Sequence, residues 1–271
     1  MARTDLRFIA LFGSATSLAF TVLLTDHRTS ALATLSNLPF AVLVSLPIAV
    51  AAAALRLVSR SGAAAGVVVA STLLAGAGWP AWSQLAVAFA FTALATRAGR
   101  RRNTLKGLIE DRDGRGWRSV TANTGLAALA AFYAHDAAVH DLAAVVIASV
   151  LVAGSSDTVA SEIGQAFGGR SAVGLFPLRR VPPGTPGAIS LVGTLAGAVS
   201  ASLMAMFGGV SGLVSTSDVA AVAVAGTAAV LLDSVISRQL EIRGWLDNDG
   251  VNLLATAAAG LLGVGLHRFW T

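Results

Sequence analysis

Long apolar stretches dominate this chain of 271 residues and decide what it can fold into. Hydrophobic residues make up 55% of the sequence and charged residues only 12%. A helix needs about 20 mainly apolar residues to cross a bilayer, and such stretches follow one another here with short polar connections. The sequence therefore predicts an all-α, polytopic membrane protein in which residues 1–271 form a single integral membrane domain.

We predict nine transmembrane helices, the third and fourth separated only by a turn. Gly76, Gly78, Trp79 and Pro80 mark this turn, because a single helix over both stretches would far exceed the thickness of a bilayer. The predicted spans are residues 6–25, 38–57, 62–77, 80–96, 121–135, 142–162, 187–207, 218–236 and 250–267.

The basic residues predict the orientation. With nine spans and a cytoplasmic N-terminus, 17 of the 19 Lys and Arg residues face the cytoplasm, and only Arg28 and Arg268 lie outside. This bias is the usual one for membrane proteins, so we place the N-terminus in the cytoplasm and the C-terminus outside. Topology also explains the net charge of +5, and no nucleic-acid partner is expected.

Cysteine is absent from the sequence, which excludes disulfides and thiolate catalysis. Small residues are frequent at helix-packing spacing, as in Gly193 with Gly197 and Gly260 with Gly263, and these pairs predict close helix contacts.

A polar arc lies at the cytoplasmic end of the sixth predicted span. At 100° per residue, Asp157, Thr158, Ser161 and Glu162 fall on one side of the helix. Carboxylates within a span are costly and usually functional, although an arc that lines a water-filled vestibule or pairs with loop arginines is an open alternative. Oxygen ligands suit Mg²⁺.

The loop before the fifth span combines basic residues with glycines. Arg115 and Arg118 can bind phosphate oxygens in a bidentate manner, the glycines allow close backbone approach, and Lys106 and Asn123 flank them. Contact with anionic lipid headgroups is the alternative, and we prefer it for Arg100, Arg101 and Arg102.

A third polar segment, residues 179–193, precedes the seventh span. It contains Arg179, Arg180, Gly184, Thr185 and Ser190, and the following helix would present its N-terminus to an anion. An ordinary proline-initiated helix start is equally compatible.

Asp233 and Asn252, near the cytoplasmic ends of the last two spans, add a carboxylate and an amide. Asp233 alone could be merely interfacial. Together, carboxylates for a metal, arginines for phosphates and a helix N-terminus at one membrane level favour phosphoryl transfer, although no Walker A or kinase glycine-loop motif occurs.

Several segments resemble the integral membrane family that contains the plastid phytyl-phosphate kinase and related eukaryotic transmembrane proteins. The resemblance covers roughly residues 60–265, and the similar segments are GRGWRSVTAN (114–123), SDTVASEIG (156–164), VPPGTPGAISLVGTLAG (181–197), LLDSVIS (231–237) and VNLLAT (251–256).

The resemblance implies an NTP-dependent membrane phosphotransferase that converts an isoprenoid monophosphate, of phytyl or another prenyl type, to the diphosphate. It implies Mg²⁺ as cofactor and a nucleoside triphosphate, CTP among the possibilities, as phosphoryl donor. Membrane lipid is a further expected partner. The implied metal or nucleotide-phosphate ligands are Asp157, Glu162 and Asp233, and the implied phosphate binders are Arg115, Arg118, Arg179 and Arg180.

The full set of candidate residues is therefore large. We expect catalytic roles for Asp157, Glu162, Arg115 and Arg118, and substrate or phosphate contacts from Lys106, Asn123, Ser161, Arg179, Arg180, Gly184, Thr185, Ser190 and Asn252.

A transporter or flippase of an anionic or lipid-phosphate substrate is the alternative function. Transporters typically place such groups near the midplane and contain internal repeats. The DxxDGxxAR pattern of CDP-alcohol transferases is missing. We expect the site to face the cytoplasm from the plasma membrane of a prokaryote, and the sequence leaves the oligomeric state open.

Overall fold

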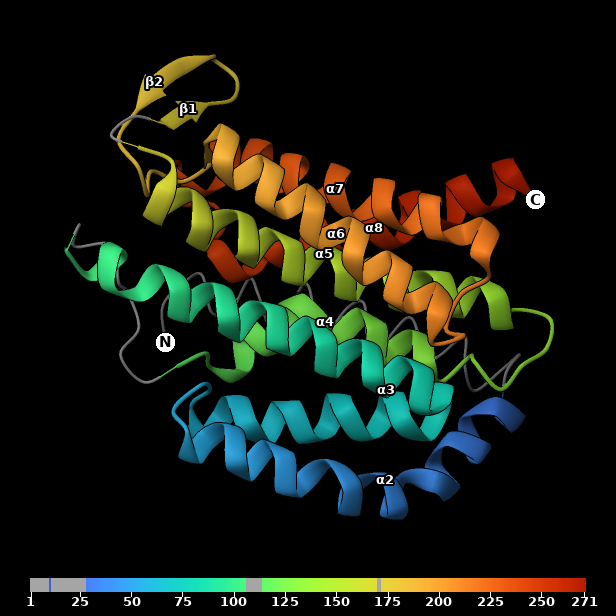
Figure 1. The fold of residues 1–271 in the computed structure, drawn as a ribbon. Helices are drawn as coiled ribbons and strands as arrows, with labels where there is room; N and C mark the ends of the chain where they lie inside the picture. The colour runs from blue at the N-terminus through green and yellow to red at the C-terminus, as the bar shows by residue number, and fades with distance from the viewer. Residues whose placement is uncertain (1–9, 11–27, 106–113, 170–171) are drawn as a thin grey trace.

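The fold is a bundle of long helices with a small sheet at one end (Figure 1). The computed structural model describes residue 10 and residues 28–105, 114–169 and 172–271. Its helices are α2 (Arg28–Ala54), α3 (Arg60–Leu105), α4 (Trp117–Ala131), α5 (His140–Phe167), α6 (Leu191–Val210), α7 (Val219–Ile236) and α8 (Asn248–Trp270), with a 3₁₀ turn η1 (Thr216–Asp218) before α7 and a π-helix η2 (Ser237–Glu241) after it.

Six helices in the described part of the chain are long and apolar enough to cross a membrane. They are α2, α3, α5, α6, α8 and the helix that joins η1, α7 and η2. The prediction of a polytopic helical membrane protein is confirmed. The first predicted span, residues 6–25, falls almost wholly outside the described residues. The number of nine spans and the side of the membrane on which each terminus lies therefore stay predictions.

The predicted turn between the third and fourth spans is present at Gly78. This residue has φ 72° and ψ −168° inside α3, a conformation that glycine adopts without a Cβ clash. A straight helix of 46 residues would be about 69 Å long. Leu57, just before α3, and Arg97, near its end, nevertheless line one cavity, so α3 folds back on itself, as Figure 1 shows.

The fifth predicted span is shorter than expected. Its residues 121–135 correspond to α4, which has 15 residues and ends at Ala131, whereas a span needs about 20. Its small residues Ala122, Ala127 and Ala131 are fully buried, because α4 packs against α3, α5 and α8. It is an internal helix of the bundle that does not reach membrane length.

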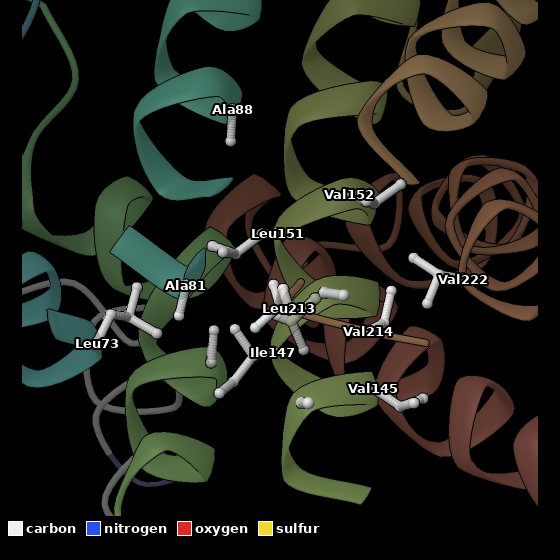
Figure 2. Close-up of a cluster of buried hydrophobic side chains, with 14 of the residues drawn as sticks. Leu73, Ala81, Ala88, Val145, Ile147, Leu151, Val152, Leu213, Val214 and Val222 are labelled. Atoms are coloured by element: carbon white, nitrogen blue, oxygen red, sulfur yellow. The ribbon is translucent and has the colours of Figure 1, made fainter. Parts of the chain in front are cut away.

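The apolar core forms around α5. This helix contacts α3, α4, α6, α7 and α8, and its first half contributes Val145, Ile147, Leu151 and Val152 to one buried cluster (Figure 2). The side chains Leu73, Ala81, Ala88, Leu213, Val214 and Val222 surround them.

Glycines bring the helices close together, as predicted. A Cβ at Gly193 of α6 would lie 2.5 Å from the Ala160 carbonyl oxygen of α5, and one at Gly197 would lie 2.9 Å from the Ala160 Cβ. On α8, a Cβ at Gly263 would lie 2.3 Å from the Ser149 hydroxyl oxygen. The predicted role in helix packing is therefore confirmed for Gly193, Gly197 and Gly263, whereas a Cβ at Gly260 would make only ordinary contacts, the nearest at 3.4 Å.

A three-stranded antiparallel sheet between α5 and α6 was not predicted. Its strands β1 (Ala172–Gly174), β2 (Arg179–Val181) and β3 (Ala188–Ile189) have the order β2-β1-β3. Gly174 pairs with Arg179 on one side and with Ala188 on the other. The sheet leads the chain from the end of α5 to the beginning of α6.

The glycine contacts give a stability prediction within α3. We expect Gly76→Ala to lower the unfolding free energy by about 1–3 kcal/mol, because its Cβ would lie 2.2 Å from the Ala131 carbonyl oxygen. Thermal unfolding in detergent micelles measures this. Gly66→Ala is the matched control, since nothing lies within 4 Å of its Cβ; equal melting temperatures for the two variants would contradict the packing argument.

Candidate functional site

A polar cavity of 940 Å³ lies at the end of the bundle where α5 ends and α4, α6 and α8 begin. The candidate site residues between positions 114 and 252 were expected at one membrane level, and most of them line this cavity. Five arginines and six carboxylates surround it: Arg56, Arg97, Arg100, Arg115, Arg118, Asp157, Glu162, Asp233, Glu241, Asp247 and Asp249.

The polar arc of α5 faces this cavity. Asp157, Thr158, Ser161 and Glu162 all line it, as the 100° spacing predicted. Small residues on the neighbouring α6 allow the approach, since a Cβ at Gly164 would lie 3.2 Å from the Gly193 Cα. The end of α5 therefore forms one wall of the cavity, which the first residues of α4, α6 and α8 also line.

The backbone of Arg115 is held by contacts with the segment that precedes α3. Its carbonyl oxygen accepts a 3.1 Å hydrogen bond from the Ser59 N–H, and Gly114 adopts φ 82° in close contact with Val58. The guanidinium then donates from Nη1 to the Thr158 hydroxyl at 3.1 Å. The backbone hydrogen bond to Ser59 thus positions the Arg115 side chain to contact the polar face of α5.

The charge of Arg115 is balanced by acids from two helices. Burial lowers its pKa, and Glu162, Asp157 and Asp249 act in the opposite direction. Guanidinium stays protonated well above neutral pH, so Arg115 contributes a full positive charge to the cavity.

Arg118 joins the beginnings of α4 and α8. Its Nη2 donates to Asp247 Oδ2, and its Nε lies 3.7 Å from Asp249 Oδ2. Asp247 is also the N-cap of α8, because its Oδ1 accepts a 3.0 Å hydrogen bond from the Gly250 N–H. The predicted phosphate binder thus has carboxylate partners in this structure.

Glu162 is held by α3. Its Oε1 accepts from the Thr96 hydroxyl at 3.0 Å, and its Oε2 accepts from Asn103 Nδ2 at 3.1 Å. Both carboxylate oxygens thus serve a contact between α5 and α3. This arrangement gives Glu162 a positioning role in addition to its place on the cavity wall.

Asp233 of α7 is a buried carboxylate with one unpartnered oxygen among the described residues. It is only 8% exposed, and its Oδ2 has no hydrogen-bond partner among the described residues. Asp157 and Glu241 are close enough to interact with it electrostatically. Buried like charges disfavour one another unless a cation or a proton intervenes, so this corner of the cavity suits a cation.

The three predicted metal ligands do not form one cluster. In the described part of the chain, no three His, Cys, Asp or Glu side chains lie together as a metal-binding group. Asp157 and Asp233 interact across the cavity, whereas Glu162 faces Thr96 and Asn103. Magnesium commonly uses one or two carboxylates together with phosphates and water, and the pair Asp157 and Asp233 fits that pattern.

Three helices begin at the cavity wall. Residues of the first turn or cap of α4, α6 and α8 line it, namely Gly116, Trp117, Arg118, Ser119, Ser190, Gly193, Asp247, Asn248 and Asp249. At the start of α6, Ser190 caps the helix, because its Oγ accepts a hydrogen bond from the Gly193 N–H at 3.1 Å. Helix N-termini carry partial positive charge and favour anions.

Other predicted residues have mixed positions. Gly184, Thr185, Ser190 and Asn252 line the cavity. Asn123 does not: its Nδ2 donates to the Ser119 carbonyl oxygen at 2.8 Å. Lys106 lies outside the described residues.

Arg179 and Arg180 are not part of the cavity wall. Both belong to the exposed strand β2, and neither lines the cavity. Both side chains are exposed on a strand at the edge of the small sheet, which the interpretation of residues 179–193 as an irregular loop could not indicate.

Several cavity residues were missed from the sequence. Arg100 had been assigned to lipid headgroups, but Arg97 and Arg100 line the cavity because the second half of α3 ends there. Asp247 could have been found, since an aspartate three residues before Gly250 and an apolar run is a typical N-cap signal.

The chain matches the family described as Integral membrane protein DUF92 over residues 43–260. This range includes every residue that lines the cavity. No solved structure gives a significant match.

Three curated proteins are similar to the chain. Protein VTE6, chloroplastic, from Arabidopsis thaliana is 29% identical over 222 residues, which are 77% of this chain and 66% of VTE6. An uncharacterized membrane protein from Synechocystis sp. is 32% identical over 195 residues, 70% of this chain and 75% of that protein. One from Methanocaldococcus jannaschii is 34% identical over 122 residues, 44% and 49% of the two chains. The chain thus spans about two thirds, three quarters and half of their lengths.

A double-mutant cycle tests the positioning role of Glu162. We expect Glu162→Ala and Asn103→Ala each to lower the melting temperature, and the double variant to lower it by less than the sum, with a coupling of about 0.5–3 kcal/mol. Denaturation in detergent micelles supplies the four stabilities. Glu162→Ala combined with Asp141→Ala, at the other end of α5, is the control; additive effects in the first cycle would show that the two side chains do not interact.

Proposed function

Because the chain belongs to the integral membrane family DUF92, we propose that it is a lipid-phosphate kinase, which is the activity that the resemblance of its motifs implies. The resemblance that the motifs indicated is confirmed at the level of the family. The proposed reaction transfers a phosphoryl group from a nucleoside triphosphate, such as CTP, to an isoprenoid monophosphate. The observation that carries the proposal is the convergence of arginines, carboxylates and three helix N-termini on one cavity at one end of a membrane bundle.

Asp157 and Asp233 are the proposed ligands of a divalent cation. They come from different helices and interact across the cavity, and Asp233 Oδ2 lacks a hydrogen-bond partner among the described residues. Bound Mg²⁺ would supply charge neutralisation for the phosphates of the donor. Within the residues that the structure describes, Glu241 is not part of a three-carboxylate ligand group, but its electrostatic interaction with Asp233 would add to the preference for a doubly charged cation.

Arg115 and the helix N-termini are the proposed phosphate site. Arg115 points into the cavity from a fixed backbone, and the N-cap residue of α4, Gly116, provides no side-chain cap. Uncapped N–H groups and guanidinium donors together favour phosphate oxygens. Arg97 and Arg100 add positive charge from α3.

The lipid chain requires access from the membrane. Leu55, Trp117 and Leu231 line the cavity and are also 62%, 41% and 38% exposed. The cavity therefore reaches the apolar outer surface of the bundle. An acceptor could keep its prenyl chain in the bilayer while its phosphate enters the cavity.

The proposed transfer needs alignment more than acid–base chemistry. An acceptor phosphate oxygen, already ionised at neutral pH, forms a bond to the γ-phosphorus while the bond from that phosphorus to the β,γ-bridging oxygen breaks. The products are the lipid diphosphate and a nucleoside diphosphate. Arginines and helix ends hold the two phosphate groups in line, which is the main requirement of phosphoryl transfer.

Transport is supported less well by the bundle. The first half of α5 lies in the apolar cluster of Figure 2, and the polar lining of the cavity belongs mainly to helix ends. A transporter would place its substrate site nearer the midplane. Polar groups confined to one end suit a reaction between a water-soluble donor and a membrane-bound acceptor.

The proposed topology keeps nine crossings, with the short helix α4 as the fifth, a cytoplasmic N-terminus and an external C-terminus. It places the cavity on the cytoplasmic side, because the basic loops that precede α4 and α6 lie there. The proposed location is the plasma membrane of a prokaryote, where cytoplasmic nucleoside triphosphate can reach the cavity.

Asp157→Asn tests the proposed function. The purified protein in lipid nanodiscs, with Mg²⁺, labelled nucleoside triphosphates and prenyl monophosphates of several lengths, is expected to produce labelled prenyl diphosphate. The variant is expected to lose about 10²–10³-fold in rate, because one of the two cation ligands is neutralised.

Asp141→Asn is the matched control, since Asp141 lies in the first turn of the same helix, at the opposite end. Its rate is expected to equal that of the wild type. Absence of labelled diphosphate with every donor and acceptor would refute the kinase. Movement of an unchanged prenyl monophosphate across sealed vesicles would support transport instead.

A further inference from the structure

The hairpin formed by β1 and β2 carries an exposed tip that combines apolar and basic side chains. Phe176 and Leu178 in the turn are 66% and 77% exposed, and Arg179 and Arg180 follow on the exposed strand β2. Neither arginine makes an ion pair with a described residue. Exposed apolar side chains beside unpaired cations are unusual for a surface that faces only water.

The structure holds this tip beside the end of a membrane helix. The Phe176 carbonyl oxygen accepts a 3.1 Å hydrogen bond from Gln239 Nε2 of η2, and Gly174 packs against the Arg238 guanidinium. Because η2 directly continues α7, the tip lies at the depth where a spanning helix ends. In Figure 1 the hairpin stands outside the helices, with its turn directed along the bundle towards the opposite end.

Backbone geometry limits how deep the tip can go. A strand with an unpaired edge cannot enter the hydrocarbon region, because its free N–H and C=O groups would lack partners. β2 is an edge strand of its sheet. The headgroup layer satisfies such groups and still accepts apolar side chains.

The segment that follows η2 also combines exposed apolar side chains with a basic residue. Ile242 and Trp245 are 50% and 56% exposed, and the Arg243 guanidinium lies 5.9 Å from the centre of the Trp245 ring. Tryptophan and arginine together are typical of the bilayer interface. Two separate segments at this end of the bundle therefore present interfacial residues.

We propose that the hairpin of residues 172–181 docks on an anionic bilayer surface, with Phe176 and Leu178 inserted at the acyl boundary and Arg179 and Arg180 on lipid phosphates. Charge complementarity selects this partner, since adjacent basic residues attract anionic lipids. The proposal depends on the chain being an integral membrane protein and is independent of the kinase reaction.

The absence of cysteine from the chain makes a direct test possible. Leu178→Cys introduces a single thiol at an exposed position, where a nitroxide label can be attached. Paramagnetic resonance then compares collisions of the label with apolar oxygen and with a water-soluble nickel chelate, in nanodiscs of zwitterionic lipid with or without anionic lipid.

We expect the oxygen-to-nickel ratio at residue 178 in anionic nanodiscs to be several-fold higher than at Ala138→Cys, an exposed control in the turn before α5. The ratio is expected to fall towards the control when Arg179→Gln and Arg180→Gln are added, and in zwitterionic nanodiscs.

Three results would overturn the proposal. The first is a ratio at residue 178 that equals the control in anionic nanodiscs. The second is a high ratio that neither the arginine substitutions nor the lipid charge changes. The third is dipolar broadening between two labels, which would identify a second copy of the chain as the occupant of this surface.

Discussion

The cost of placing carboxylates near the end of a membrane helix governs the organisation of this protein. Asp157 and Glu162 lie in the last turns of α5, the helix that the other helices surround. An isolated carboxylate there would be strongly unfavourable. The bundle compensates with Arg115, which is fixed by backbone contacts, and with hydroxyl and amide donors from α3. The cavity is the space in which these compensating groups meet.

Hydropathy and helical periodicity predicted much of this arrangement. The break at Gly78, the polar arc of α5 and the glycine contacts all follow from local rules about helices in lipid. Helix ends that lie on one side of a membrane share one level, so motifs at those ends can meet. The gathering of distant motifs at one cavity could therefore be anticipated without a structure.

Other features depend on contacts that a single sequence does not reveal. The length of α4 is limited by where it packs, so an apolar segment suggested a full span where the helix has only 15 residues. The sheet places Arg179 and Arg180 outside the cavity, while the reversal of α3 brings in Arg97 and Arg100. Charge alone could not show which of these arginines line the cavity, because the fold of the backbone determines where each side chain lies.

The contact between Gly164 and Gly193 has a further implication for how such a cavity diversifies. There α5 and α6 meet without intervening side chains, and a single added methyl group would push them apart. That wall is consequently fixed in shape. Phe89 of α3 and Leu231 of α7, which also line the cavity, are larger side chains that can be exchanged for smaller or bulkier ones. For the proposed kinase, adaptation to acceptors of different length would accordingly change these larger side chains and leave the charged residues intact.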